Sequence, residues 1–232
     1  CYAIFFVTFL YAIGFVGNFV VPKSIDSAPI VPLGQAFLVN IGLLGLFGLQ
    51  HSAMARQEFK TWWTTIVPQP AERSTYVLFS SLCLITLFYF WQPLGMTIWN
   101  VENPMFRNLL YVCFGFGWLL VLVTTFLINH FDLFGLRQVY LYLRGKDYTP
   151  LSFVTPGPYN HVRHPLYVGW FFAFWSTPTM TVAHLVFAVV TTVYILVAIQ
   201  LEERDLVKIH GQAYADYRDR VPMLIPLGRR KA

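Results

Sequence analysis

The chain has 232 residues, of which 56% are hydrophobic and only 12% charged, and its formal net charge is +5. Soluble domains carry about a quarter charged residues, so the composition excludes an ordinary soluble domain and predicts a polytopic integral membrane protein. The cysteines Cys1, Cys83 and Cys113 lie in apolar runs without CxxC spacing, which argues against a disulfide framework or a metal site. Because residue 1 already lies inside an apolar run, we expect the natural start to lie upstream.

Apolar runs that approach or reach the length of a membrane crossing, about 20 residues, follow one another along the chain. The first four are residues 1–21, 33–54, 76–91 and 109–128. The next apolar region, residues 166–199, is too long for one crossing and is interrupted by STPT at 176–179. Since proline ends or kinks a helix, this region predicts a helical hairpin.

The predicted fold is therefore an all-α transmembrane helix bundle. It has five crossing segments, the last of which is a hairpin, and a C-terminal helix on the cytoplasmic side. We expect one integral membrane domain over residues 1–232.

The basic residues predict the orientation of the bundle. Fourteen of the sixteen Lys and Arg residues follow the second, fourth and last runs, and a five-helix path brings these three regions to one side. Lys23 and Arg107 remain for the other side. The positive-inside rule makes the basic side cytoplasmic. The positive charge then matches anionic lipid headgroups, and there is no case for a nucleic-acid partner.

The segment TPGPYNHVRHPLYVGW, residues 155–170, is unusually polar and rigid for the entrance of a membrane helix. Two prolines and a glycine predict a non-helical approach, and Pro165 suits the first turn of a helix. Arg163 and His164 precede that turn, where free N–H groups and the helix dipole favour an anion. The segment predicts a pocket for a carboxylate, and the alternative is a capped helix with an interfacial Arg–His pair.

The segment that follows the last apolar run, EERDLVKIHGQAYADYRDRVP, predicts an amphipathic helix. Its adjacent carboxylates Glu202 and Glu203 lie at the mouth of the hairpin and need partners. Arg163 or Arg204 is one candidate, and a ligand amine or hydroxyl is another. The alternative is a solvated helix after the membrane.

Together these two segments resemble the isoprenylcysteine carboxyl methyltransferase superfamily over residues 155–226, which the resemblance makes the cofactor-binding part. In that family the Arg-His-Pro-x-Tyr segment and the Glu-Glu helix close over S-adenosylmethionine on the cytoplasmic side. The resemblance implies a cofactor site made of Tyr159, His161, Val162, Arg163, His164, Tyr167, Glu202, Glu203, His210 and Tyr214.

The rest of the chain is similar to a narrower branch, the bacterial methanethiol S-methyltransferases. The segments that carry this similarity are QHSAMARQEFK, ERSTYVLFSS, WQPLG and NHFDLFGLRQVYLYLRG. The branch implies methylation of methanethiol to dimethyl sulfide. Two alternatives remain: a methyltransferase for an isoprenylcysteine carboxylate or another lipidic substrate, and a non-enzymatic membrane protein of the neighbouring denitrification-linked branch.

A small thiol is mostly protonated at neutral pH, because its pKa is near or above the value of about 8.5 for cysteine. A nearby base, or a positive field that favours the thiolate, would assist methyl transfer. Polar residues at the predicted cytoplasmic helix ends supply a candidate catalytic group: His51, Arg73, His130, Asp132 and Arg137. Asp132 is a candidate to orient a histidine. A histidine at a helix end is also often structural, so the sequence does not single out one base.

Other functional classes fit the pattern less well. A transporter needs polar groups near the bilayer midplane, whereas polarity here gathers at one face. A haem or quinone subunit needs histidines inside facing helices, and His184 is the one histidine near the interior of an apolar run. The pair in HVRH, spaced i, i+3 beside a turn, is a weak zinc signal, so we expect that no metal is required. The expected partners are a small thiol and the lipid bilayer.

Overall fold

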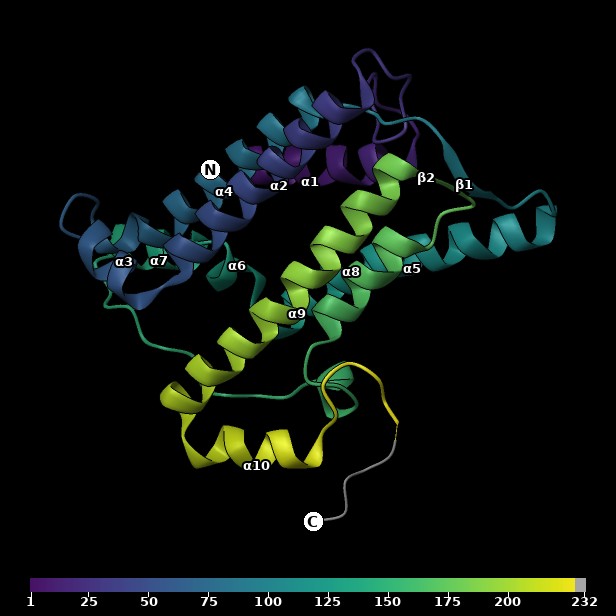
Figure 1. The fold of residues 1–232 in the computed structure, drawn as a ribbon. Coiled ribbons are helices and arrows are strands. Elements are labelled where there is room, and N and C mark those ends of the chain that lie inside the picture. Colours follow the sequence, from purple (N-terminus) through teal and green to yellow (C-terminus); the bar gives the residue numbers. More distant parts are fainter. Residues whose placement is uncertain (228–232) are drawn as a thin grey trace.

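The computed structural model describes residues 1–227, which form mainly helices (Figure 1). The long or apolar helices are α1 (Tyr2–Gly17), α2 (Leu33–Ala55), α4 (Glu72–Phe90), α5 (Pro104–Ile128), α8 (Pro165–Trp175) and α9 (Val182–His210). The shorter helices are α3 (Gln57–Trp63), η1 (Gln69–Ala71), α6 (His130–Leu133), α7 (Leu136–Leu143), η2 (Gly157–Asn160) and α10 (Gln212–Arg220). Two short strands, β1 (Thr97–Asn100) and β2 (Thr179–Thr181), pair antiparallel.

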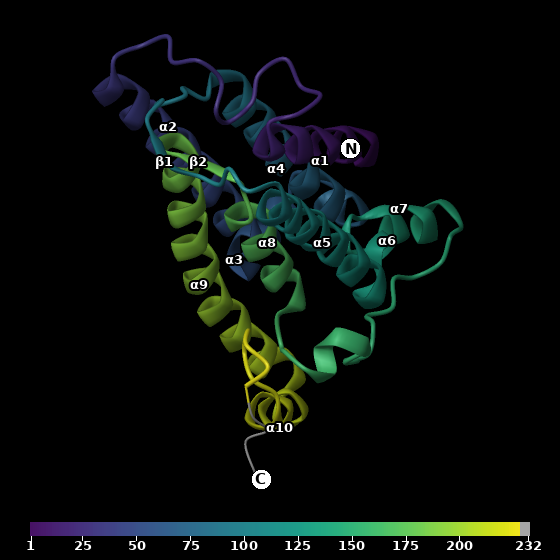
Figure 2. The same ribbon diagram turned by 90° about the vertical axis from the view of Figure 1, so that its right-hand side faces the viewer.

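The bundle has two distinct ends, which Figures 1 and 2 show from two sides. The β1–β2 pair lies at one end, called the ribbon end, and α10 lies at the other, called the basic end. Helix α9 joins them; its 29 residues span about 43 Å at 1.5 Å per residue. The basic residues after α2, α5 and α9 follow termini at the basic end, and an ion pair between Arg56 and Asp205 links the ends of α2 and α9.

The predicted transmembrane helix bundle is confirmed. Four helical segments are long and apolar enough to cross a membrane: Leu33–Ala55, Gln69–Phe90, Pro104–Ile128 and Val182–His210. The first apolar run forms the shorter α1, whose 16 residues span about 24 Å, less than the hydrocarbon thickness of about 30 Å. The region after residue 165 is a hairpin, as predicted, with α8 and α9 joined through β2.

Three details differ from the sequence-based expectation. The β1–β2 pair was not predicted, so the fold is not purely helical. The short helices α3, α6 and α7 lie in segments for which no helix was expected. The amphipathic helix predicted after residue 199 is the continuation of α9 as far as His210, and Gly211 then separates it from α10 with φ 57° and ψ −132°. Backbone with positive φ favours glycine, because a Cβ atom is strained there.

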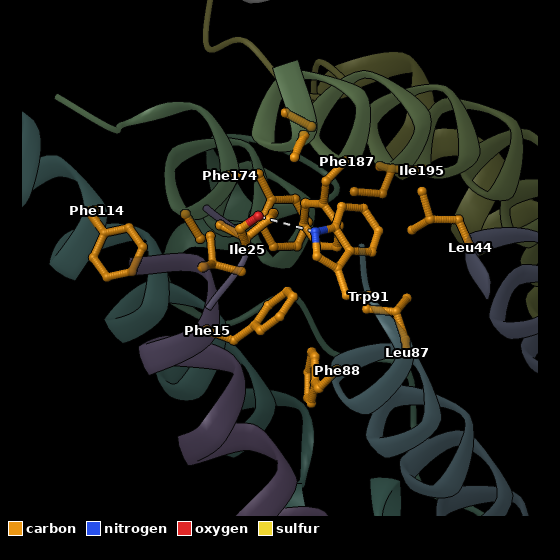
Figure 3. Packing of buried hydrophobic residues seen from close by; sticks show 14 of the residues in the cluster. Phe15, Ile25, Leu44, Leu87, Phe88, Trp91, Phe114, Phe174, Phe187 and Ile195 are labelled. Carbon is orange, nitrogen blue, oxygen red and sulfur yellow. Dashed lines mark hydrogen bonds between the residues drawn. The ribbon is translucent and has the colours of Figure 1, made fainter. Parts of the chain in front are cut away.

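Figure 3 shows the packing of the hydrophobic core, which includes residues near the ribbon end of several helices. Phe15, Phe174 and Phe187 pack there from three helices around Trp91, which follows the end of α4 and is fully buried. Its indole Nε1 donates a hydrogen bond of 3.1 Å to the carbonyl of Ile25, which satisfies the buried polar group. The core therefore anchors the helices at the ribbon end, and the polar side chains discussed below gather at the other end.

Helices α5 and α8 make the closest helix contact, which depends on two glycines. A Cβ atom at Gly117 would lie 2.5 Å from the backbone N of Ala173 and 2.7 Å from the carbonyl O of Gly169. A Cβ atom at Gly169 would lie 2.8 Å from the carbonyl O of Gly117. Since backbone atoms are the obstacles, the helices can approach this closely only with small residues at the crossing, as is common in membranes.

We expect Gly117→Ala to destabilise the protein by about 1–3 kcal/mol, the usual cost of overpacking a tight contact. Gly115→Ala is the matched control. Gly115 lies on the same helix, and a Cβ atom there would have no neighbouring atom within 4 Å. Thermal unfolding of the purified protein in detergent measures both. Equal melting temperatures for the two variants would contradict the packing described here.

Candidate active site

The basic end holds a buried cluster of Arg163, His164 and Glu203. Arg163 Nε donates to Glu203 Oε1 at 2.7 Å, and His164 Nε2 lies 2.9 Å from the same oxygen. The side chains of Arg163, His164 and Glu203 are 11%, 5% and 10% exposed. The carboxylate that the sequence predicted for the pocket before α8 is thus the chain's own Glu203. A buried ion pair of this kind is tolerated because its hydrogen bonds are made.

Arg163 also holds the segment after α10 against the start of α8. Its Nη1 donates to the carbonyls of Arg218 and Val221 at 2.9 and 2.6 Å. The backbone N–H groups of Arg163 and His164 donate to the carbonyls of Pro222 and Met223. The resulting closure joins the two segments that the sequence analysis combined into one site.

Glu202 is the open member of the Glu-Glu pair. Its side chain is 45% exposed, and its Oε2 accepts a hydrogen bond of 2.9 Å from the hydroxyl of Tyr167. The second feature available to a ligand is the hydroxyl of Tyr214, which is buried and has no hydrogen-bond partner within the described residues. A buried polar atom without a partner is costly and rare in native proteins, so the Tyr214 hydroxyl is a group that a ligand could bond to.

The remaining predicted cofactor residues lie around this cluster. Val162 is buried and His161 is exposed. The carbonyl of Tyr159 accepts a hydrogen bond of 2.6 Å from Tyr217. His210 packs against Phe153, which also contacts Tyr214 and Tyr217. Burial raises the pKa of Tyr214 and raises that of Tyr217 to about 12, so both hydroxyls stay neutral at physiological pH.

The predicted catalytic group separates into three places. His51 on α2 contacts Tyr76 on α4, whose hydroxyl lies 2.8 Å from Nε2 and 3.0 Å from Nδ1. Ser80 Oγ lies 3.2 Å from His51 Nδ1. Arg73 lies beside this pair, with its guanidinium carbon 5.2 Å from the centre of the Tyr76 ring. His51 and Arg73 are thus brought together through a tyrosine that the sequence analysis did not select.

His130 lies in a separate, packed cluster. Its Nδ1 is 2.8 Å from Thr125 Oγ1, its Nε2 is 2.6 Å from the Tyr2 hydroxyl, and its ring stacks on Phe126. The residue is 3% exposed, and burial lowers the pKa of its imidazole. Both nitrogens are engaged, so His130 has the surroundings of a structural histidine.

Asp132 and Arg137 form the third place. Arg137 Nη1 donates to Asp132 Oδ1 at 2.9 Å and to the carbonyl of Thr149 at 2.9 Å. The Tyr148 hydroxyl donates to Asp132 Oδ2 at 3.3 Å. The prediction that Asp132 orients a histidine thus finds no support in its contacts, because Arg137 and Tyr148 are its partners. The link to the His51 cluster is Arg73, whose Nε donates to the Leu133 carbonyl at 2.9 Å.

Two side chains in the neighbourhood of His51, Tyr194 and Tyr76, were not predicted from the sequence. The Tyr194 hydroxyl on α9 is 3.1 Å from Ser52 Oγ on α2. Tyr194 and Glu202 on α9 are among the ionisable groups near Tyr76. A signal for Tyr76 existed in the motif ERSTYVLFSS, where it falls three residues after Arg73 and therefore on the same face of a helix.

Known proteins resemble the chain over most or all of its length. It is 62% identical to the methanethiol S-methyltransferase of Crocosphaera subtropica over 232 residues, all of this chain and 91% of that protein. It is 54% identical to the enzyme of the same name from Mycobacterium tuberculosis, over 97% of this chain and 92% of that protein. The chain belongs to the methanethiol S-methyltransferase family.

The wider comparisons agree with this membership. The family model described as phospholipid methyltransferase matches residues 109–213. Nurim of Xenopus laevis is 32% identical over 75% of this chain and 64% of that protein. No solved structure matches the chain. The predicted membership is confirmed, and the chain is a methyltransferase embedded in a membrane by its apolar helices.

The structure also bears on metal binding. Within residues 1–227, no group of three or more His, Cys, Asp or Glu side chains is arranged to hold a metal ion. That the reaction needs no metal stays a prediction.

Proposed function

We propose that the enzyme transfers a methyl group from S-adenosylmethionine to methanethiol, forming dimethyl sulfide at the cytoplasmic face of a bacterial inner membrane. The observation that carries the proposal is 62% identity, over the whole chain, to a protein named methanethiol S-methyltransferase. The distribution of basic residues supports the cytoplasmic orientation of the basic end.

The residues at the basic end suit a cofactor that combines hydroxyl and amino groups with a positive charge. Glu202 offers a half-exposed carboxylate, and Tyr214 offers a buried hydroxyl without a partner. Tyr167 and Tyr159 would line the same site, and the Arg163–His164–Glu203 cluster would hold its walls together. When bound, S-adenosylmethionine supplies a methyl group already activated on a sulfonium.

The protein's part in the reaction is to bind and orient the two reactants, to exclude water and to favour the thiolate. His51 is our candidate base for the thiol proton, since it lies at the basic end of α2 beside Tyr76 and Arg73. The positive charge of Arg73 would favour a nearby thiolate over the neutral thiol. Arg137 and Asp132 would act indirectly, by fixing the segment whose Leu133 carbonyl holds Arg73.

We expect Glu202→Gln to weaken cofactor binding about 10- to 150-fold, the equivalent of one charge-assisted hydrogen bond of about 1.5–3 kcal/mol. Calorimetric titration with S-adenosylhomocysteine measures the affinity. The matched control is Asp205→Asn on the same helix, because Asp205 is 46% exposed against 45% for Glu202. Equal affinities for the two variants would contradict the role of Glu202.

The second candidate function is methylation of a lipidic substrate, such as an isoprenylcysteine carboxylate, which the match to the phospholipid methyltransferase model favours. Purified enzyme with S-adenosylmethionine is offered methanethiol, a farnesylated cysteine or phospholipid vesicles in separate reactions. Our proposal predicts product from methanethiol at a rate well above that from either lipid. Turnover of a lipid with no turnover of methanethiol would replace the proposal with the second candidate.

A further inference from the structure

The hydrogen bonds within the His51–Tyr76–Ser80 cluster have no role in the reaction as described so far. The Tyr76 hydroxyl lies within hydrogen-bonding distance of both imidazole nitrogens, 2.8 Å from Nε2 and 3.0 Å from Nδ1. Ser80 Oγ, one helical turn after Tyr76 on α4, lies 3.2 Å from Nδ1. Phe47, one turn before His51 on α2, stacks on the imidazole with ring centres 5.2 Å apart. The imidazole is thus held from both helices.

These contacts define a direction for proton movement. A neutral imidazole has one N–H donor and one acceptor nitrogen. With the proton on Nδ1 and directed at Ser80, Nε2 accepts the O–H of Tyr76 at the shorter of the two distances. The tyrosine oxygen then donates its only proton to His51 and keeps its lone pairs for another donor.

Charged groups of both signs lie near that oxygen. The Arg73 guanidinium lies 5.2 Å from the Tyr76 ring, is held by the Leu133 carbonyl and favours a thiolate beside it. The other ionisable groups near Tyr76 are Glu72 on its own helix and Tyr194 and Glu202 on α9, and the two carboxylates oppose a negative charge there. Glu202 is also the residue proposed above for the cofactor.

The same turn of α2 carries a second group that could receive a ligand. Gln50 lies next to His51, and its Oε1 atom is buried without a hydrogen-bond partner in the described part of the chain. Its Nε2 atom donates a hydrogen bond of 3.1 Å to Met54 Sδ, so the atom without a partner is the acceptor Oε1. An S–H group is a weak donor, and a small thiol is therefore a ligand that this acceptor would complete.

We propose that Tyr76 is a catalytic residue that receives the thiol proton and passes its own proton to His51. The proposal rests on the proposed function and identifies where its thiol binds. In the step, the S–H bond breaks as a new O–H bond forms on Tyr76, and the original O–H bond breaks as an N–H bond forms on His51 Nε2. The products are a thiolate beside Arg73 and an imidazolium, so charge and protons balance.

The test is Tyr76→Phe, which keeps the ring in its packing and removes the hydroxyl. The matched control is Tyr2→Phe, which removes a tyrosine–histidine hydrogen bond of 2.6 Å at His130 instead. At pH 7 we expect Tyr76→Phe to lower kcat at least about 10-fold, the low side of general acid–base effects, with the same affinity for S-adenosylhomocysteine. The deficit should shrink as pH approaches the thiol pKa, because solution then supplies the thiolate. Tyr2→Phe should keep the wild-type pH profile.

Methaneselenol provides a second readout, since a selenol is already ionised at neutral pH and needs no base. Tyr76→Phe should then methylate methaneselenol at the wild-type rate. A purely structural role would instead lower the rate equally for the thiol and the selenol, and at every pH. That result, or a wild-type kcat with methanethiol at pH 7, would overturn the proposal. If the wild-type enzyme does not methylate methanethiol at all, the proposed function itself has failed.

Discussion

Replacing Arg163 with alanine is expected to destabilise the protein by about 3–5 kcal/mol, the usual loss when one partner of a buried ion pair is removed. Glu203 would remain 10% exposed with its strongest partner gone. The same substitution removes the bonds to the carbonyls of Arg218 and Val221 that hold the segment after α10. Thermal unfolding in detergent measures the loss, and calorimetry with S-adenosylhomocysteine should show weakened binding in whatever fraction folds.

The chain offers an exposed ion pair as the control for this prediction. Arg56 and Asp205 lie 3.3 Å apart, with side chains 36% and 46% exposed. Exposed pairs contribute about 0–1 kcal/mol, so Arg56→Ala should have a small effect. Arg163→Lys keeps the charge but loses the planar set of donors that reaches three acceptors, and should fall between the two. Equal losses for Arg163→Ala and Arg56→Ala would contradict the assigned role of the buried cluster.

Replacing His51 with glutamine is expected to lower kcat for methanethiol at pH 7 by about 10²- to 10⁴-fold, the range of general acid–base catalysis. Glutamine can still bond to Tyr76 and Ser80 but cannot accept a proton at neutral pH. The affinity for S-adenosylhomocysteine should stay within about threefold. The change in binding free energy is then well below the roughly 1.4 kcal/mol that corresponds to a factor of ten. Steady-state kinetics and calorimetry separate these two effects.

The other histidine of the predicted catalytic group gives the contrast. His130 is 3% exposed, and both of its ring nitrogens are engaged. His130→Gln should therefore lower the melting temperature clearly and change the kcat of the folded enzyme little. A large loss of kcat in His130→Gln, with an unaffected His51→Gln, would show that the base belongs to the other cluster. Loss of cofactor affinity in His51→Gln would mean that His51 serves binding instead of proton transfer.

Much of the fold could be predicted from the sequence because membrane crossing requires long apolar runs. The interruption by STPT gave the hairpin, since proline and polar residues end a helix, and α8 ends at Trp175 beside it. The β1–β2 pair could not be predicted in this way. Its strands have four and three residues, and they pair across the 78 residues from Asn100 to Thr179, so only the packed bundle brings them together. The helices α3, α6 and α7 were missed because short segments carry little periodicity.

The candidate site was predicted in its composition more than in its contacts. An arginine and a histidine before a helix N-terminus predicted a carboxylate, and Arg163 was one candidate partner for Glu202 and Glu203. The sequence left Arg204 and a ligand open as partners, and in the structure Glu203 is the carboxylate that Arg163 and His164 bind. The sequence pattern also suggested that Asp132 orients a histidine. In the structure Arg137, which follows later in the same segment, donates a hydrogen bond to Asp132 instead. Tyr76 was missed because a tyrosine near the end of a membrane helix has the ordinary appearance of an interfacial aromatic.

The most direct measurement of the proposed reaction follows the methyl group itself. Purified enzyme is given methanethiol and S-adenosylmethionine whose transferable methyl group is fully deuterated, and the headspace is analysed by mass spectrometry. We predict dimethyl sulfide with one deuterated methyl group, accompanied by an equal amount of S-adenosylhomocysteine. Active, folded enzyme that forms no labelled dimethyl sulfide, or places the label in a lipid instead, would contradict the account.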